Sequence, residues 1–230
     1  MMKRTLLVYG VAYSVLLVVV FGLLFTYPKL ELHMMLNSYH SAIQDVFFKY
    51  YSMLAEGPLY ALGLLPLIWK KIKITVFYAI CELSGGAFLQ ILKHTFSFER
   101  PVSAFENCQD MMLPLVQGVD MHHSNSFPSG HASTFFMFCT CSVIILAYYN
   151  RKKNADGKRH KCTLVYVSLL SLLVFAVLGA YSRVYLSQHF LLDVFVGSII
   201  GFLTPLLIFY VGRNKFIKPQ TKDENEEIVA

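Results

Sequence analysis

Charged residues are scarce in this chain of 230 residues. Asp, Glu, Lys and Arg together make up 15% of it, whereas hydrophobic residues make up 56%. Soluble domains carry about 25% charged and about 45–50% apolar residues. The shortage of charge therefore excludes an ordinary soluble domain and indicates a membrane protein.

The sequence also lacks a disulfide framework and a zinc-binding pattern. Most of its cysteines fall in apolar segments or a basic loop, and only Cys108 lies in a long polar loop. The five are Cys81, Cys108, Cys139, Cys141 and Cys162. We interpret them as packing residues.

No small-residue cleavage site follows the first apolar run, which extends from Thr5 to Tyr27 after the basic pair Lys3-Arg4. The run is also longer than the apolar core of a signal peptide, about 7–15 residues. We therefore predict that this segment is the first transmembrane helix.

The apolar residues fall into blocks of about twenty, enough to span a hydrocarbon core of roughly 30 Å. The sequence predicts one all-α, polytopic membrane domain over residues 1–230, with an amphipathic interfacial helix between 28 and 51. Residues 215–230 are expected to form a disordered cytoplasmic tail. The six transmembrane helices are predicted near 5–27, 52–69, 74–92, 131–149, 163–181 and 192–212.

The basic residues are divided unequally between the two sides of this predicted topology. Fifteen of the twenty Lys and Arg residues fall on the side of both termini, and five fall on the other side. Cytoplasmic loops carry the excess of positive charge, so both termini are predicted to be cytoplasmic. The net charge of +6 does not indicate a nucleic-acid partner, because the cations lie between apolar blocks.

Two motifs lie in the first long outer loop. Lys93 and Arg100 stand seven residues apart, and two cations at that spacing could clamp a phosphate or anchor the chain at the headgroups. The segment Pro128-Ser129-Gly130-His131 directly precedes the fourth span. A helix N-terminus there would provide an anion site, although a simple turn into the helix explains the same residues.

The second outer loop contains Arg183, His189 and Asp193. If the sixth span begins near His189, then His189 and Asp193, four residues apart, share one helical face. The carboxylate could then hold one ring N–H and leave the other nitrogen free to attack phosphorus. A purely structural His–Asp pair at a helix start is the alternative.

Together these segments resemble the type 2 phosphatidic acid phosphatase superfamily, whose signature is K-x6-RP, PSGH and SR-x5-H-x3-D. Every signature position is present, from Lys93 through Arg100-Pro101 and the PSGH segment to Ser182-Arg183, His189 and Asp193. The resemblance implies that His189 forms a phosphohistidine, that Asp193 orients it, and that His131 is the general acid. The phosphoryl oxygens would be held by Lys93, Arg100, Ser129, Gly130 and Arg183.

The resemblance implies an integral lipid phosphatase of a bacterial inner membrane, with its site on the periplasmic face and no cofactor. The segments 113–116 and 123–128 are similar to bacterial lipid A phosphatases, so lipid A is the first substrate considered. Undecaprenyl pyrophosphate, phosphatidylglycerol phosphate and phosphatidic acid are alternatives. A lipid phosphotransferase and a non-catalytic lipid-binding protein are further alternatives, whereas a haloperoxidase or a transporter fits poorly.

Four residues have no assigned role at this point. His94, His122 and His123 fit no metal-ligand pattern and are interpreted as rim or surface residues. Glu82 lies inside the predicted third span, where a carboxylate is costly unless it is paired. A structural hydrogen bond and a catalytic role both remain open for Glu82. The oligomeric state is not predicted.

Overall fold

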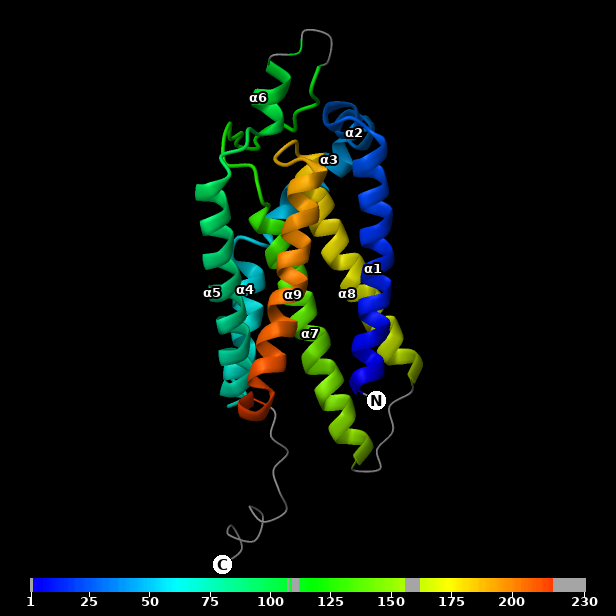
Figure 1. Cartoon of the computed structure of the whole chain (residues 1–230), viewed down its shortest axis with the longest axis vertical. Coiled ribbons are helices and arrows are strands. Elements are labelled where there is room, and N and C mark those ends of the chain that lie inside the picture. The colour runs from blue at the N-terminus through cyan, green and yellow to red at the C-terminus, as the bar shows by residue number, and fades with distance from the viewer. Residues whose placement is uncertain (1, 107, 109–111, 156–161, 217–230) are drawn as a thin grey trace, which may run out of the picture.

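A computed structural model describes residues 2–106, 108, 112–155 and 162–216, without the side chains of 151–155, 162–163 and 213–216. Every regular element in this part of the chain is a helix, so the predicted all-α class is confirmed (Figure 1). The tail from 217 onward lies outside the described residues. The elements are α1 (Met2–Thr26), α2 (Lys29–Leu36), α3 (Ala42–Met53), α4 (Pro58–Leu64), η1 (Leu65–Leu67), α5 (Ile72–Thr95), α6 (Pro101–Glu106), α7 (Gly130–Ala155), α8 (Cys162–Tyr185) and α9 (Leu191–Phe216).

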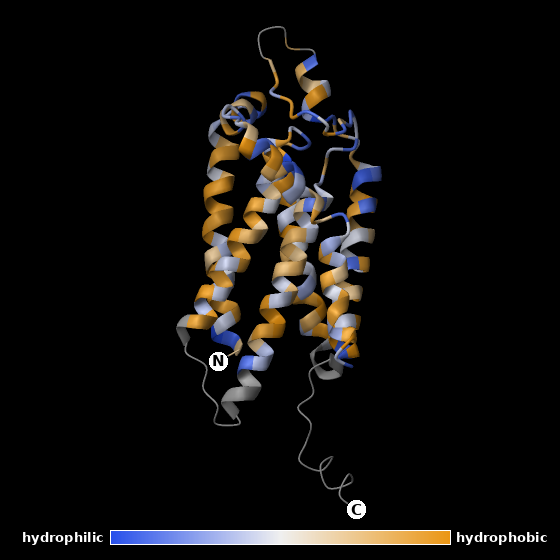
Figure 2. Ribbon diagram, turned by 180° about the vertical axis from the view of Figure 1, so that it is seen from behind, coloured by the Kyte–Doolittle hydropathy of each residue, from blue (hydrophilic) through white to orange (hydrophobic). Residues whose placement is uncertain are grey.

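Within the described residues, five helices are long and apolar enough to cross a membrane. They are α1, α5, α7, α8 and α9, and they correspond to five of the six predicted spans. Their sides carry mostly hydrophobic residues, and hydrophilic residues gather toward the ends of the bundle (Figure 2). The structure therefore supports an integral membrane protein, as the composition indicated.

The predicted second span, 52–69, is not one continuous long helix. α3 ends at Met53, a turn follows, and Gly57 and Pro58 begin the short helix α4. Pro66 then lies in the 3₁₀ turn η1. Proline lacks the N–H that continues a helical ladder, which accounts for these short pieces. The apolar helix over 58–67 is shorter than a usual transmembrane helix, so the sixth span remains a prediction.

The predicted interfacial helix over 28–51 is divided into α2 and α3. Ser41 begins the second helix as its N-cap, where its hydroxyl accepts a hydrogen bond from the Gln44 N–H at 3.3 Å. Asn37 ends the first helix. Both helices lie at the same end of the bundle as α6, opposite the start of α1 (Figure 1).

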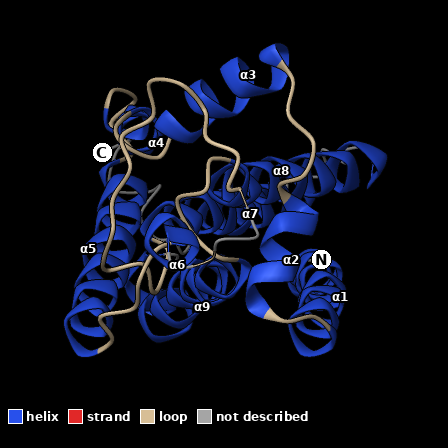
Figure 3. Cartoon of the chain, turned by 90° about the horizontal axis from the view of Figure 1, so that it is seen from above, coloured by secondary structure: helices blue, strands red, loops and turns tan. Residues whose placement is uncertain are grey.

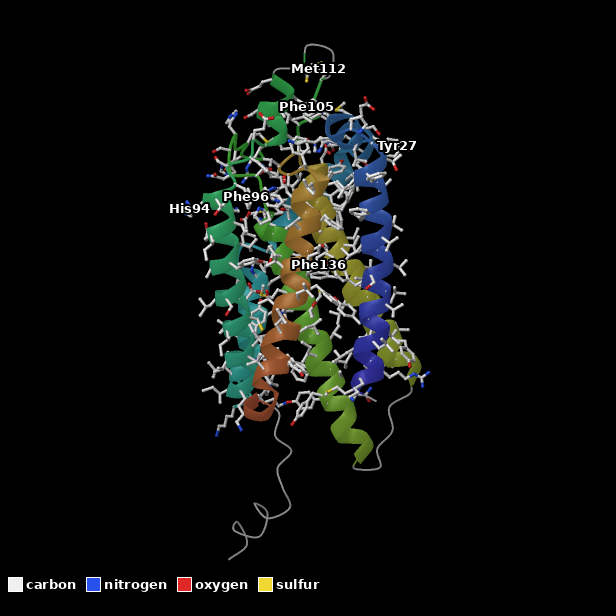
Figure 4. The ribbon with its side chains drawn as sticks, viewed as in Figure 1. Tyr27, His94, Phe96, Phe105, Met112 and Phe136 are labelled. Carbon is white, nitrogen blue, oxygen red and sulfur yellow. The ribbon has the colours of Figure 1, made fainter. Side chains whose placement is uncertain are left out.

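Helix α7 is at the centre of the bundle and packs most extensively against α9 and α8 (Figure 3). Phe136, in its first half, is buried in the middle of the molecule (Figure 4). Tyr13 of α1 packs against Phe136 and stacks on Phe202 of α9, with ring centroids 5.3 and 4.1 Å apart. The Tyr13 hydroxyl also bonds Ser198 at 2.9 Å, which links α1 to α9.

Two glycines allow α9 to approach α7 closely. A Cβ atom at Gly197 would lie 2.4 Å from the Ser129 carbonyl oxygen, and one at Gly201 would lie 2.2 Å from that of Ser133. Small residues four positions apart commonly permit such contacts between membrane helices. The Ser129 N–H also donates to the Asp193 carbonyl oxygen at 3.0 Å. The glycines therefore bring the second and third turns of α9 against the start of α7, and the Ser129 hydrogen bond joins that start to the first turn of α9.

Candidate active site

The structure brings the predicted site residues together near one end of the bundle. They come from the end of α5, the loop before α6, the start of α7, the end of α8 and the start of α9. Electrostatic interactions link His131 to Arg183, His189, Lys93 and Arg100. Residues nearly one hundred positions apart in the sequence therefore share one site.

His189 lies at the buried side of this site, with a side chain only 2% exposed. Its Nδ1 atom is 3.6 Å from Asp193 Oδ2 and 3.4 Å from the Ser126 hydroxyl. Ser126 donates a short hydrogen bond of 2.5 Å to Asp193 Oδ2. Ser126 thus connects the imidazole to the carboxylate, and Nε2 is the ring nitrogen turned away from this pair.

Helix α9 begins at Leu191, so His189 precedes the helix and does not share a helical face with Asp193. The reason is the cap of this helix. Asp193 Oδ2 accepts a hydrogen bond from the Phe190 N–H at 2.9 Å, as an acidic residue in the first turn commonly does. The same oxygen therefore caps the helix and faces the imidazole.

Gln188 joins the two buried arginines. Its Oε1 accepts hydrogen bonds from Arg100 Nη1 at 3.1 Å and from Arg183 Nη2 at 3.3 Å. Its Nε2 donates to the Asp120 carbonyl oxygen at 2.5 Å. Arg183 Nη1 also donates to the Ser52 hydroxyl, and its Nε has no hydrogen-bond partner. Two guanidinium groups around one oxygen form an arrangement suited to a phosphoryl group.

His131 belongs to a second pair of histidine and carboxylate. Its Nε2 lies 3.2 Å from Glu56 Oε1, which comes from the turn between α3 and α4. Both residues line a cavity of about 350 Å³, and Lys93 and Gly130 line the same cavity. This cavity is the space next to the proposed phosphate-binding residues.

The start of α7 contributes Ser129 and Gly130. Ser129 is fully buried, and its hydroxyl accepts a weak hydrogen bond of 3.4 Å from the Ala132 N–H. A Cβ atom at Gly130 would meet nothing within 4 Å, so the backbone there is open to a ligand. The N–H groups of the first turn have no helical partners and attract anions.

Burial lowers the pKa of His189 to about 4, and the charges of Arg183 and Arg100 act in the same direction, whereas Asp193 opposes the shift. The imidazole is therefore uncharged at neutral pH. An uncharged imidazole has the free electron pair that a nucleophile requires.

Three residues of this site were not found from the sequence: Ser126, Gln188 and Glu56. Gln188 directly precedes His189, and Ser126 lies three residues before Ser129, so proximity to the motifs was the available signal. Glu56 had no such signal, because it reaches His131 from a distant turn.

The other histidines considered in the sequence, His94, His122 and His123, have exposed side chains. His122 and His123 are exposed, and His123 contacts Ser103 at 3.2 Å. His94 is exposed at the outer end of α5 (Figure 4). Among the described residues, no three His, Cys, Asp or Glu side chains are grouped as metal ligands. The interpretation of these histidines as rim or surface residues agrees with their exposure.

The sequence model of the PAP2 superfamily matches residues 74–217 of this chain. This range includes every signature motif and more than half of the chain. The chain belongs to the PAP2 superfamily. Phosphatidylglycerophosphatase B of Bacillus subtilis strain 168 is 38% identical over 92 residues, covering 40% of this chain. The match spans only 39% of that relative.

Two solved structures share the fold. Aquifex aeolicus LpxE superposes with a TM-score of 0.61 and 25% identity, covering 80% of this chain and 97% of that protein. A transmembrane PAP2-type phosphatidylglycerolphosphate phosphatase from Bacillus subtilis gives a TM-score of 0.57 and 18% identity, covering 92% and 98% of the two chains. Membership of this superfamily, together with the name of the 38% identical relative, indicates a phosphatase.

Ser126→Ala should lower kcat about 10- to 100-fold and leave KM nearly unchanged, because only the orientation of Asp193 and His189 is lost. Phosphate release measured over a range of substrate concentrations would test this. Ser124→Ala is the control, since Arg100 Nε contacts only the backbone carbonyl oxygen of Ser124. A raised KM with unchanged kcat would instead indicate that Ser126 binds the substrate.

Proposed function

We propose that this PAP2 protein hydrolyses a phosphomonoester of a membrane lipid through a phosphohistidine at His189. The observation that carries the proposal is the orientation of the buried imidazole. Its Nδ1 faces Ser126 and Asp193, so Nε2 is available for attack beside Arg100 and Arg183.

In the first step, the electron pair of His189 Nε2 forms a bond to phosphorus while the bond to the lipid oxygen breaks. His131 gives a proton to that departing oxygen. In the second step, His131 takes a proton from water, the water oxygen attacks phosphorus, and the N–P bond breaks to release inorganic phosphate. His189 is thereby restored.

Charge on the transferred phosphoryl group would be stabilised by Lys93, Arg100 and Arg183. Ser129 and the Gly130 N–H would bind the remaining oxygens. Phosphoryl transfer requires mainly positioning and charge stabilisation, and three fixed cations can supply both. We therefore expect activity without added metal.

Our first choice of substrate is lipid A, dephosphorylated on the periplasmic face of a bacterial inner membrane. The likeness to Aquifex aeolicus LpxE and the segments 113–116 and 123–128 support this choice. The Bacillus subtilis relative supports phosphatidylglycerol phosphate as an alternative. Phosphatidic acid and undecaprenyl pyrophosphate complete the set to be tested.

The sidedness proposed here has both termini in the cytoplasm and six spans, the second of them formed by the short helices over 52–67. An interfacial arrangement of α2 and α3 belongs to the same proposal. Cysteine labelling of a position in the loop 112–126 from outside intact cells would test it. Labelling that occurs only after the cells are opened would place this loop in the cytoplasm and contradict the proposed orientation.

The decisive assay is the release of inorganic phosphate from each lipid by purified protein in EDTA. Release of phosphate in stoichiometric amounts with dephosphorylated lipid supports a hydrolase. Transfer of labelled phosphate to a lipid or sugar acceptor, without matching free phosphate, would identify a phosphotransferase. Binding of lipid without either product would identify a non-catalytic lipid-binding protein.

The imidazole of His189 should remain uncharged well below the usual histidine pKa of about 6.5. A pKa of about 4 keeps the imidazole mostly uncharged at pH 5, so His189 can still act as a nucleophile in mild acid. NMR titration of histidine-labelled protein, with His189→Asn to identify the signal, would measure this pKa. A midpoint at or above 6.5 would contradict the expected effect of burial.

A further inference from the structure

The cavity beside His131 extends far beyond the phosphate-binding residues. It lies between α4, α5 and α7, and it continues from Lys93 past Gln90 and Gly86 to Glu82. Eleven positions separate Lys93 from Glu82, which corresponds to about 16 Å along a helix. The cavity is therefore long enough to hold more than a phosphate group.

The inner part of this cavity is polar. The side chains of Glu82, Tyr60 and Thr134 are among the residues that line it. The Tyr60 hydroxyl bonds Thr134 Oγ1 at 3.0 Å in the same wall. A wall that carries a carboxyl group and hydroxyl groups favours a ligand with complementary polar groups over a hydrocarbon chain.

The proposed reaction determines which part of the substrate enters the cavity. The attacking and departing groups of a phosphoryl transfer lie roughly in line, on opposite sides of phosphorus. The departing oxygen is therefore on the side of His131, away from His189. His131 lines the cavity, and so the alcohol that leaves must occupy it.

We infer that the leaving alcohol is a sugar or glycerol headgroup whose hydroxyl or amide N–H groups bind Glu82 and Tyr60. This inference rests on the proposed function and deepens it. A diacylglycerol or polyprenyl leaving group has no such donors and would place hydrocarbon against the polar side chains of Glu82 and Tyr60, which is unfavourable. Glu82 is thus a specificity-determining residue.

Wild-type protein should distinguish the two classes of substrate. In mixed micelles at equal surface concentration, kcat/KM for a phosphorylated glucosamine lipid or for phosphatidylglycerol phosphate should exceed that for phosphatidic acid at least about 10-fold. Equal or better hydrolysis of phosphatidic acid would overturn the inference while supporting phosphatase activity. Failure to hydrolyse any of these lipids would instead overturn the proposed function.

Variants of the cavity wall provide the second test. Glu82→Leu should reduce the ratio of kcat/KM between the sugar lipid and phosphatidic acid about 10- to 100-fold, and Glu82→Gln should reduce it less. Tyr60→Phe tests the same wall without altering charge. Leu83→Ala is the matched control, because Leu83 is the next residue on α5 and is 75% exposed.

The ratio between two substrates separates specificity from a general loss of structure. A variant that is only less stable loses activity on both lipids equally and keeps the wild-type ratio. An unchanged ratio in folded Glu82→Leu, Glu82→Gln and Tyr60→Phe proteins overturns the inference. A reduced ratio in the Glu82 variants, with Leu83→Ala unchanged, supports it.

Discussion

His189→Asn is expected to abolish phosphate release, with a fall in kcat of about 10⁴- to 10⁶-fold. Loss of a nucleophile has effects of this size in other covalent enzymes. The site offers no substitute, because His131 is the proposed acid and pairs with Glu56 at 3.2 Å. Asparagine keeps a polar side chain of similar reach, so its effect should be chemical more than structural.

The intermediate gives a more direct measurement than the rate. Rapid quenching of wild-type protein with lipid labelled in its phosphate should trap protein-bound label that is stable in alkali and labile in acid, as expected of an N–P bond. His189→Asn should bind no label, and His94→Asn, at an exposed histidine, should label normally. Normal labelling of His189→Asn would exclude His189 as the nucleophile.

Most of the fold could be predicted from the lengths of the apolar segments alone. Five predicted spans correspond to long helices, and the motif-bearing loops lie at one end of them. The second span could not be predicted as it occurs, because its average hydrophobicity does not register the breaks at Gly57, Pro58 and Pro66. The average hydrophobicity of a segment indicates whether the segment lies in the membrane. Single residues such as proline determine where a helix within that segment begins or ends.

The site was predictable to the extent that motif spacing reflects chemistry. Motif residues such as His189 and Arg100 are named by their pattern, and they come together in the structure. The residues that contact them are not identified by any sequence pattern. Ser126 and Gln188 act through side-chain geometry that appears only after folding. Asp193 illustrates the difference, since its role as a helix cap displaces His189 from the helix that the spacing suggested.

The two histidines occupy contrasting environments that suit different tasks. His189 is nearly fully buried and lies beside a buried carboxylate linked through Ser126. The His131 side chain is 25% exposed and pairs with a Glu56 side chain that is 56% exposed. A buried nucleophile is protected from protonation, whereas an acid that must exchange a proton with water benefits from access to it.

Arg183→Lys is expected to lower kcat/KM about 10²- to 10³-fold, comparable to removing a main donor from an oxyanion site. Lysine retains the positive charge but not the planar fork, and it cannot contact Ser52 and Gln188 together as the guanidinium does. The inhibition constant of inorganic phosphate should rise in the same variant, because the product occupies the same site.

Arg4→Lys is the matched control, since Arg4 is exposed near the start of α1, at the opposite end of the bundle. It should retain wild-type kcat/KM and phosphate inhibition. If Arg183→Lys retains them as well, charge alone suffices at this position, and the contact through Gln188 only supports the fold. A large loss confined to Arg183→Lys means instead that the fork geometry, held by Gln188 between Arg183 and Arg100, is what binds the phosphoryl group.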